Sequence, residues 1–125
     1  MSYNIDIFNV KKMENLQIPV ASFYKSSCSD WHPIETIDRS TGLAIHTFEI
    51  AELVTVSGSV VDDKLHVISI DCCGEGSGFA WDEILQPVLE DSTGIFSVSC
   101  VWEGGDSINR FDVVDGVITS TDIEI

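Results

Sequence analysis

Basic side chains are scarce in this sequence. Its 125 residues contain six Lys and Arg against 21 Asp and Glu, which gives a formal net charge of −15 at pH 7. A surface of that sign repels nucleic acid and anionic lipid and attracts basic partners. We therefore expect no direct binding to nucleic acid or to a membrane, and we expect a basic protein as the partner.

Long apolar runs are also missing. No stretch of the sequence approaches the roughly 18 consecutive apolar residues that a membrane-spanning helix requires. The opening residues, Met-Ser-Tyr-Asn-Ile-Asp, lack the basic and apolar segments of a secretory signal peptide. These absences predict a protein without a membrane span, located in the cytoplasm.

The cysteines lack the regular spacing of a disulfide framework. Adjacent cysteines such as Cys72 and Cys73 rarely pair with each other, so we expect free thiols in a reducing compartment. A bridge from Cys100 to Cys28 or to Cys73 is the alternative.

Metal-binding motifs are absent too. No two cysteines have the Cys-x-x-Cys spacing that brings two thiolates onto one zinc ion. His46 and His66 lie in predicted strands that can be neighbours, but a surface or half-buried strand histidine is the simpler interpretation. We therefore expect no metal and no cofactor. The scattered donors are Cys28, His32, His46, His66, Cys72, Cys73 and Cys100.

The sequence offers little for catalysis. Nucleophilic catalysis needs a thiolate in contact with a base, and surrounding carboxylates raise the pKa of a thiol. The segment Gly74–Gly78 joins a strand to a helix, as phosphate-binding loops do, but it lacks the lysine of such loops and contains Glu75. We expect a flexible turn there and no enzymatic activity. The cysteine and histidine candidates would be Cys72 or Cys73 with His46 or His66.

Apolar residues, by contrast, are plentiful. They make up 44% of the chain, and the mean hydropathy is +0.19. Enough apolar surface is therefore available to offset the entropy cost of folding, despite the charge. The length is that of one ordinary domain, and we expect residues 1–125 to form it.

The acidic residues are unevenly distributed. From Leu65 to Ile125 twelve acidic residues face one basic residue, Arg110, for a net charge of −11, whereas Met1–Lys64 carries −4. The acidic surface is therefore expected mainly on the second half of the chain.

Alternating apolar and polar residues predict strands through most of the sequence. Short polar turns predict hairpins at Asp62–Lys64 and, from the Asp-Gly pair, at Asp115–Gly116. Gly58 is expected to mark a bulge, and Ile68 is expected to share a face with Ile70. The predicted strands are Tyr3–Val10, Leu43–Ile50, Leu53–Val61, Leu65–Cys72, Ile95–Trp102, Asn109–Val114 and Val117–Ile125.

The first 40 residues or so give a weaker pattern. Lys11–Leu16 is polar and is assigned a helical turn. Ile18–Tyr24 has a strand-like composition, with Pro19 restricting it to a strand start or an edge. Ser26–Gly42 has the composition of a loop.

One helix is predicted at about residues 79–91. Its apolar residues recur at helical spacing, with Ser77 as the expected N-cap and Gly94 just beyond its C-terminus. Pro87 removes one internal hydrogen bond and is expected to kink or split the helix near Leu85–Gln86. The apolar face consists of Trp81, Ile84, Leu85, Val88 and Leu89.

These elements predict an α+β fold. We expect a mainly antiparallel sheet of about six to seven strands, with the central helix packed on one face. Trp81 is expected in the core, Trp102 partly exposed, and Trp31 either anchoring a loop or making a contact.

Charge, size and the lack of catalytic motifs favour an inhibitor of a basic protein. The most specific hypothesis is an immunity protein (antitoxin) against a nucleic-acid-cleaving toxin, whose active site must be basic. The alternatives are a DNA-mimicking inhibitor of a nucleic-acid-binding effector, and a small ligand-binding domain or enzyme that uses Gly74–Gly78. The expected contact residues are Asp82, Glu83, Glu90, Asp91, Trp102, Glu103, Asp106, Asp112 and Asp115.

Overall fold

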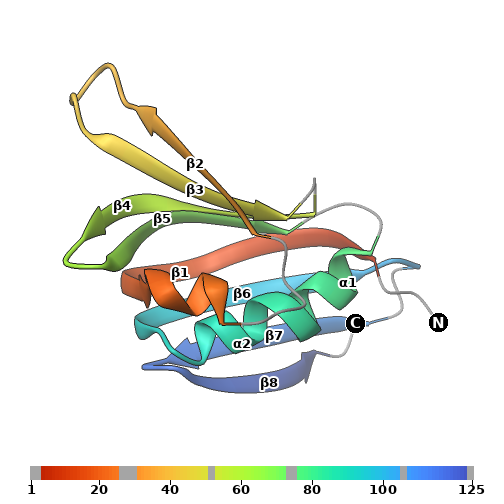
Figure 1. Cartoon of the computed structure of the whole chain (residues 1–125). Coiled ribbons are helices and arrows are strands. Elements are labelled where there is room, and N and C mark those ends of the chain that lie inside the picture. Colours follow the sequence, from red (N-terminus) through yellow and green to blue (C-terminus); the bar gives the residue numbers. More distant parts are fainter. Residues whose placement is uncertain (1–3, 26–30, 51–52, 73–75, 105–106, 124–125) are drawn as a thin grey trace.

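Eight strands form one sheet in the computed structural model of the chain (Figure 1). The structure describes residues 4–25, 31–50, 53–72, 76–104 and 107–123. The order across the sheet is β2-β3-β4-β5-β1-β6-β7-β8, and every neighbouring pair is antiparallel. The strands are β1 Ile5–Pro19, β2 His32–Ile37, β3 Ala44–Ile50, β4 Val54–Val61, β5 Lys64–Cys72, β6 Thr93–Trp102, β7 Ile108–Val114 and β8 Val117–Ile123.

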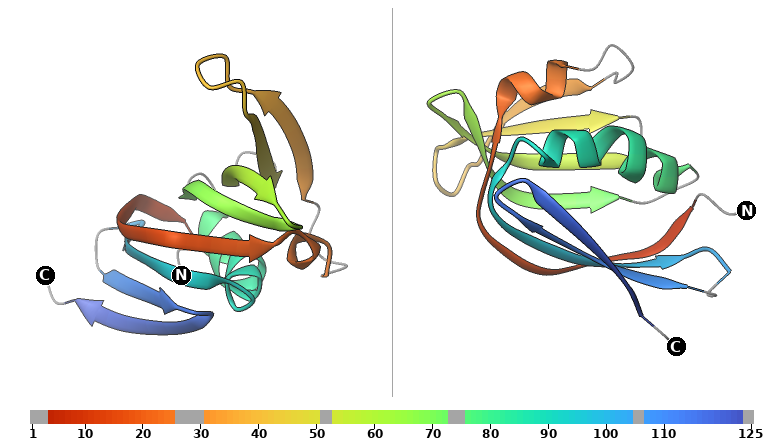
Figure 2. Two further views of the ribbon diagram at one scale, coloured as in Figure 1. Left: turned by 90° about the vertical axis from the view of Figure 1, so that its left-hand side faces the viewer. Right: turned by 90° about the horizontal axis from the view of Figure 1, so that it is seen from below.

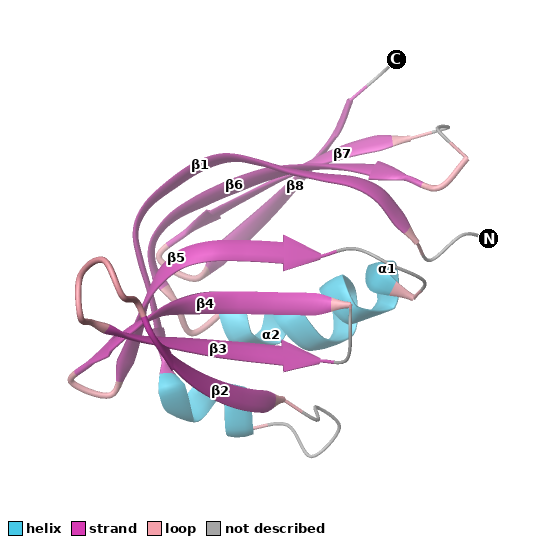
Figure 3. Cartoon of the chain, turned by 90° about the horizontal axis from the view of Figure 1, so that it is seen from above, coloured by secondary structure: helices cyan, strands magenta, loops and turns pink. Residues whose placement is uncertain are grey.

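The predicted fold class is confirmed. A mainly antiparallel sheet carries helical segments on one face, which Figures 2 and 3 show from different sides. The predicted count of six to seven strands is wrong, because the described residues contain eight. The difference arises in the N-terminal third of the chain.

β1 is much longer than its sequence pattern suggested. The helical turn predicted for Lys11–Leu16 is wrong, because this segment continues β1 and pairs with β6 through Lys12–Ser97 and Met13–Phe96. Its polar side chains are exposed while Leu16 is buried. The extended conformation of this segment depends on pairing with a strand about 80 residues away. The local sequence pattern cannot reveal such pairing.

Two further assignments near the N-terminus are corrected. Ile18–Tyr24 is not a strand of its own, since Ile18 and Pro19 end β1 and Val20–Tyr24 forms the 3-10 helix η1. The predicted loop Ser26–Gly42 contains β2, whose six residues pair in unbroken register with β3.

The helix runs from Ser77 to Leu89 in three segments. α1 is Ser77–Phe79, the π-helical segment η2 is Ala80–Leu85, and α2 is Gln86–Leu89. The helix changes from π to α between Leu85 and Gln86, which is where Pro87 was predicted to kink or split it. Pro87 has no N–H to donate and would clash with the carbonyl one turn earlier. The wider π turn, with the Gln86 N–H bonded to the Trp81 carbonyl, accommodates it.

Both predicted helix caps are corrected. The N-cap is Gly76, and the Ser77 hydroxyl instead accepts a hydrogen bond of 2.8 Å from the backbone N–H of Ile5. Gly94 lies inside β6 with φ 94°, where a Cβ atom would be 2.2 Å from the Asn15 carbonyl oxygen. Gly94 therefore allows β1 to approach β6 closely, and the helix has already ended.

The predicted hairpins are confirmed. β7 and β8 are joined by Asp115 and Gly116, with φ of 46° and 85°, the positive values of a type I′ turn. The bulge predicted at Gly58 is confirmed by a register shift in the β4–β5 pair. Because that shift leaves Ile68 unpaired, Ile68 is 59% exposed and does not share the buried face with Ile70.

The core lies between the helix and one face of the sheet. Trp81 is fully buried, as predicted, and its ring contacts Phe8 and Phe111. Trp31 is also buried and packs edge-on against Phe23, so it anchors its segment to the core. The helix therefore packs against the central part of the sheet, and no described helix covers the opposite face (Figure 3).

Candidate functional site

The helix presents two of the predicted carboxylates to solvent without internal partners. Glu83 and Glu90 are exposed, and neither side chain makes a hydrogen bond or ion pair within the part of the chain that the structure describes. Asp82 is also exposed, and its carboxylate accepts a 3.0 Å hydrogen bond from the Gln86 side chain. Partial burial, then the nearby Glu83 carboxylate, raises the pKa of Asp82.

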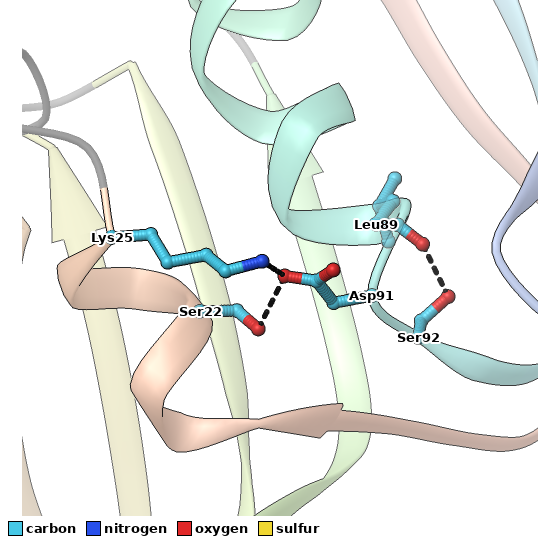
Figure 4. A network of polar contacts seen from close by, with 5 residues as sticks. All are labelled: Ser22, Lys25, Leu89, Asp91 and Ser92. Carbon is cyan, nitrogen blue, oxygen red and sulfur yellow. Dashed lines mark hydrogen bonds and ion pairs between the residues drawn. The ribbon is translucent and has the colours of Figure 1, made fainter.

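Asp91, by contrast, is tied into the fold (Figure 4). One oxygen of its carboxylate accepts hydrogen bonds from Lys25 Nζ at 2.6 Å and from the Ser22 hydroxyl at 2.8 Å. These donors, Lys25 first, lower the pKa of Asp91. Ser22 belongs to η1 and Lys25 follows it directly, so the contact joins the end of the helix to the segment after β1. Its charge is partly neutralised within the chain.

Two predicted carboxylates of the last three strands also bond internally. Asp112 on β7 accepts hydrogen bonds from the Ser97 hydroxyl at 2.6 Å and from Arg110 Nε at 3.2 Å. The Ser97 bond, and then Arg110, lower the pKa of Asp112. Asp115 accepts a 2.9 Å hydrogen bond from the Gly94 N–H, so it fixes the β7–β8 turn against β6.

Trp102 and Glu103 lie at the opposite end of β6. Trp102 is partly exposed, as predicted, and its indole N–H donates to the Asn109 side-chain oxygen at 2.5 Å. The Asn109 amide in turn donates to Asp122 on β8. Glu103 accepts a 2.7 Å hydrogen bond from the Asn4 amide. Asp106 lies outside the described residues.

The predicted site residues that the structure describes therefore do not form one cluster. Gly116 packs against the Glu90 carbonyl, which brings Glu90, Asp91 and Asp115 together at the end of the helix. Trp102 and Glu103 are at the other end of β7, whose seven residues span about 20 Å. Two acidic regions result, with Asp82 and Glu83 on the helix that runs between them.

Sequence reasoning missed three polar residues: Asn4, Asn109 and Asp122. The register of the final hairpin contains the signal for two of them, since pairing Val114 with Val117 places Asn109 opposite Asp122. No comparable signal exists for Asn4, which meets Glu103 and the N–H of Gly76 only through the fold.

The histidines and cysteines whose side chains the structure describes form no reactive group. His46 on β3 and His66 on β5 lie on either side of β4, and His46 Nε2 is 3.0 Å from Glu35. Cys100 is a free buried thiol, so neither alternative bridge to it is present. Burial, and then Asp82, raise the pKa of Cys100 to about 12. Cys28 and Cys73 lie outside the described residues.

The described end of the Gly74–Gly78 segment is occupied by the chain itself. The Gly76 N–H donates to the Asn4 side chain at 2.6 Å, and Ser77 and Gly78 are buried. Gly74 and Glu75 lie outside the described residues. Across the described ranges, no group of three or more His, Cys, Asp or Glu is arranged to hold a metal ion.

Comparison with known proteins identifies no relative of this chain. The chain matches no protein-family model, no curated protein and no solved structure. Among the described helices, none is long and apolar enough to cross a membrane.

Proposed function

We propose that the chain is a non-enzymatic cytoplasmic inhibitor that binds a basic protein, most specifically an immunity protein against a nucleic-acid-cleaving toxin. The observation that carries this proposal is the placement of the charge. No acidic residue in the described ranges is buried, and the buried polar residues there are all serines. The carboxylates of the described residues, which make up most of the acidic side chains of the sequence, therefore all reach solvent.

Such a surface suits rapid capture of a cationic partner. Nucleases hold phosphates with Lys and Arg side chains, and an acidic protein is steered toward such a site at rates far above those of a neutral pair. The two acidic regions and the helix between them offer carboxylates over a length comparable to a protein interface.

The ion pairs and hydrogen bonds within the chain suggest different roles for different carboxylates. Glu83 and Glu90 are exposed and have no ion-pair partner among the described residues, whereas Asp91 and Asp112 form ion pairs with Lys25 and Arg110. We therefore assign the strongest electrostatic role to Glu83 and Glu90, and mainly structural roles to Asp91 and Asp112.

Copurification tests the proposal directly. The tagged chain is coexpressed with the product of the neighbouring gene, and any basic protein that copurifies is assayed for nuclease activity with and without the chain. A stable complex that loses nuclease activity supports the proposal. If the neighbouring product and other basic toxins neither bind nor lose toxicity, the immunity function is wrong. Inhibition of a non-toxic nucleic-acid-binding effector would favour DNA mimicry instead.

Charge reversal is predicted to act at the contact region. Glu83→Lys should slow association several-fold, whereas Glu35→Lys on β2, an identical change in net charge, should slow it much less. Reversal of Glu103 together with Asp106 should also slow association and reduce its salt dependence. Stopped-flow mixing at several salt concentrations measures these rates. Equal effects of Glu83→Lys and Glu35→Lys would remove the helix from the contact region.

A further inference from the structure

The sheet has two edge strands, β2 and β8, and they differ in how well they are protected (Figure 1). An unprotected edge presents unpaired N–H and C=O groups to any extended chain. Next to β2, the Asp38 N–H donates a hydrogen bond to the Leu43 carbonyl. Because hydrogen-bonded and non-hydrogen-bonded pairs alternate in an antiparallel ladder, the backbone groups of Ile37, Glu35 and Pro33 are directed away from β3. Pro33 has no N–H, and β2 therefore offers an interrupted edge.

β8 has no such interruption. Its sequence, Val-Ile-Thr-Ser-Thr-Asp-Ile, contains no proline and no basic residue, and six of its seven residues are exposed. Most of these residues favour extended backbone. Three features that often blunt an edge strand, a proline, a lysine and a bulge, are therefore absent from β8.

The turn before β8 determines which backbone groups are available. In a two-residue hairpin the residues that flank the turn, here Val114 and Val117, form a hydrogen-bonded pair. The β7–β8 register then continues without a shift to Ile108 and Ile123. Alternation along the strand directs the N–H and C=O groups of Ile118, Ser120 and Asp122 away from β7.

We propose that the β8 edge is the site at which an extended, basic segment of the partner adds as a ninth strand. The inference rests on the proposed function and specifies where and how the partner is held. Main-chain hydrogen bonds to the three outward-facing residues would provide affinity, and side-chain pairs would provide selectivity.

The charge of the surroundings selects a basic occupant. Asp122 is the charged residue of β8, and its carboxylate is positioned by the Asn109 amide. Asp115 at the turn adds further negative charge, whereas Asp112 on β7 forms an ion pair with Arg110. A Lys or Arg on the added strand beside Asp122 would make a favourable cross-strand pair. A second copy of this chain would bring a further net charge of −15 to the same edge.

The test compares two variants of one residue, Ser120→Pro and Ser120→Ala. The proline removes an outward N–H without touching the β7–β8 ladder, as edge strands tolerate, while the alanine removes only the hydroxyl. The probe is a synthetic peptide of alternating Lys and Val, and its control is the Glu and Val counterpart. Binding is followed by NMR and amide hydrogen exchange, with β7 amides reporting that the fold is intact.

Strand addition predicts a specific pattern. The Lys-Val peptide should slow exchange at Ile118, Ser120 and Asp122, and should leave Thr119 and Thr121 as they are in the unbound protein. Ser120→Pro should weaken binding about tenfold, Ser120→Ala should not, and Asp122→Asn should weaken the Lys-Val peptide alone. Equal binding to both proline and alanine variants, or concentration-dependent dimers through β8, would overturn the proposal.

The same variants separate this inference from the proposed function. If a toxin complex forms and is insensitive to Ser120→Pro, the function stands and the β8 site is wrong. If no basic protein binds the chain while the Lys-Val peptide still protects the three amides, the β8 edge is a peptide site and the immunity function is wrong.

Discussion

Asp91 shows that a single carboxylate in an acidic protein can be structural. Its carboxylate accepts hydrogen bonds from both Lys25 and Ser22, and it thereby connects two segments 66 residues apart. Asp91→Asn should lower the free energy of unfolding by about 1 kcal/mol, a modest loss because Lys25 is largely exposed. Glu90→Gln is the matched control and should be neutral or slightly stabilising, since it only relieves repulsion. Urea unfolding of the three proteins measures both effects.

The Asp91 effect should depend on pH in one direction. Because the folded state lowers the pKa of Asp91, its stabilisation is fully present above the usual aspartate pKa of 3.8 and is lost as the pH falls through the folded value. The difference between wild type and Asp91→Asn should therefore be constant from neutral pH to about pH 5 and shrink below pH 4. A difference that grows on acidification would contradict this role.

Single residues were only partly predictable from the sequence. The core position of Trp81 followed from helical periodicity, since one apolar stripe must face the sheet. The bonds of Asp91 and Glu103 could not be predicted, because their donors, Lys25 and Asn4, reach them only through the folded topology.

At the scale of elements, Gly94 is the position on which the β1–β6 contact depends. Gly94→Ala should destabilise the protein by at least about 2 kcal/mol, since its Cβ would clash with backbone at a left-handed φ. Gly42→Ala is the matched control, because Gly42 also has positive φ but nothing lies within 4 Å of its Cβ. It should cost about 1 kcal/mol from backbone strain alone. Equal losses in denaturant titrations would show that the close approach is unimportant.

The elements that sequence predicted well are those with local causes. The β7–β8 hairpin follows from its Asp-Gly turn, and the division of the helix follows from Pro87. The part of β1 after Val10 and the whole of β2 were missed because their conformations depend on β6 and β3, which lie far along the chain or beyond an uninformative loop. Local composition carries no record of such pairing.

At the scale of the whole molecule, the excess of negative charge should weaken the folded state through self-repulsion. Raising NaCl from about 10 mM to about 150 mM shortens the Debye length from roughly 30 Å to roughly 8 Å. The melting temperature should therefore rise by several degrees, as calorimetry can measure. An uncharged osmolyte such as glycerol at equal osmolality is the control. A melting temperature that stays flat or falls with NaCl would show that repulsion is unimportant to stability.

The sequence predicts that the acidic surface lies mainly on the second half of the chain, but it does not predict how those residues are arranged. Of the described contact residues, Asp115 and Glu103 lie at opposite ends of β6, with Asp82 and Glu83 on the helix between them. The positions of these residues depend on the length of the strands and on which end of β6 each turn adjoins. Neither can be predicted from the number of charged residues. The β8 edge was likewise visible only once the order of the strands was known.

The negative charge of this protein is proposed to capture a basic partner. The most direct measurement is the association rate constant between the chain and the basic product of the neighbouring gene, by stopped-flow fluorescence from about 20 mM to about 500 mM NaCl. Electrostatic capture predicts rapid binding at low salt and an association rate constant that falls at least tenfold over this range. Binding at a rate independent of salt, or no binding at any salt concentration, would contradict it.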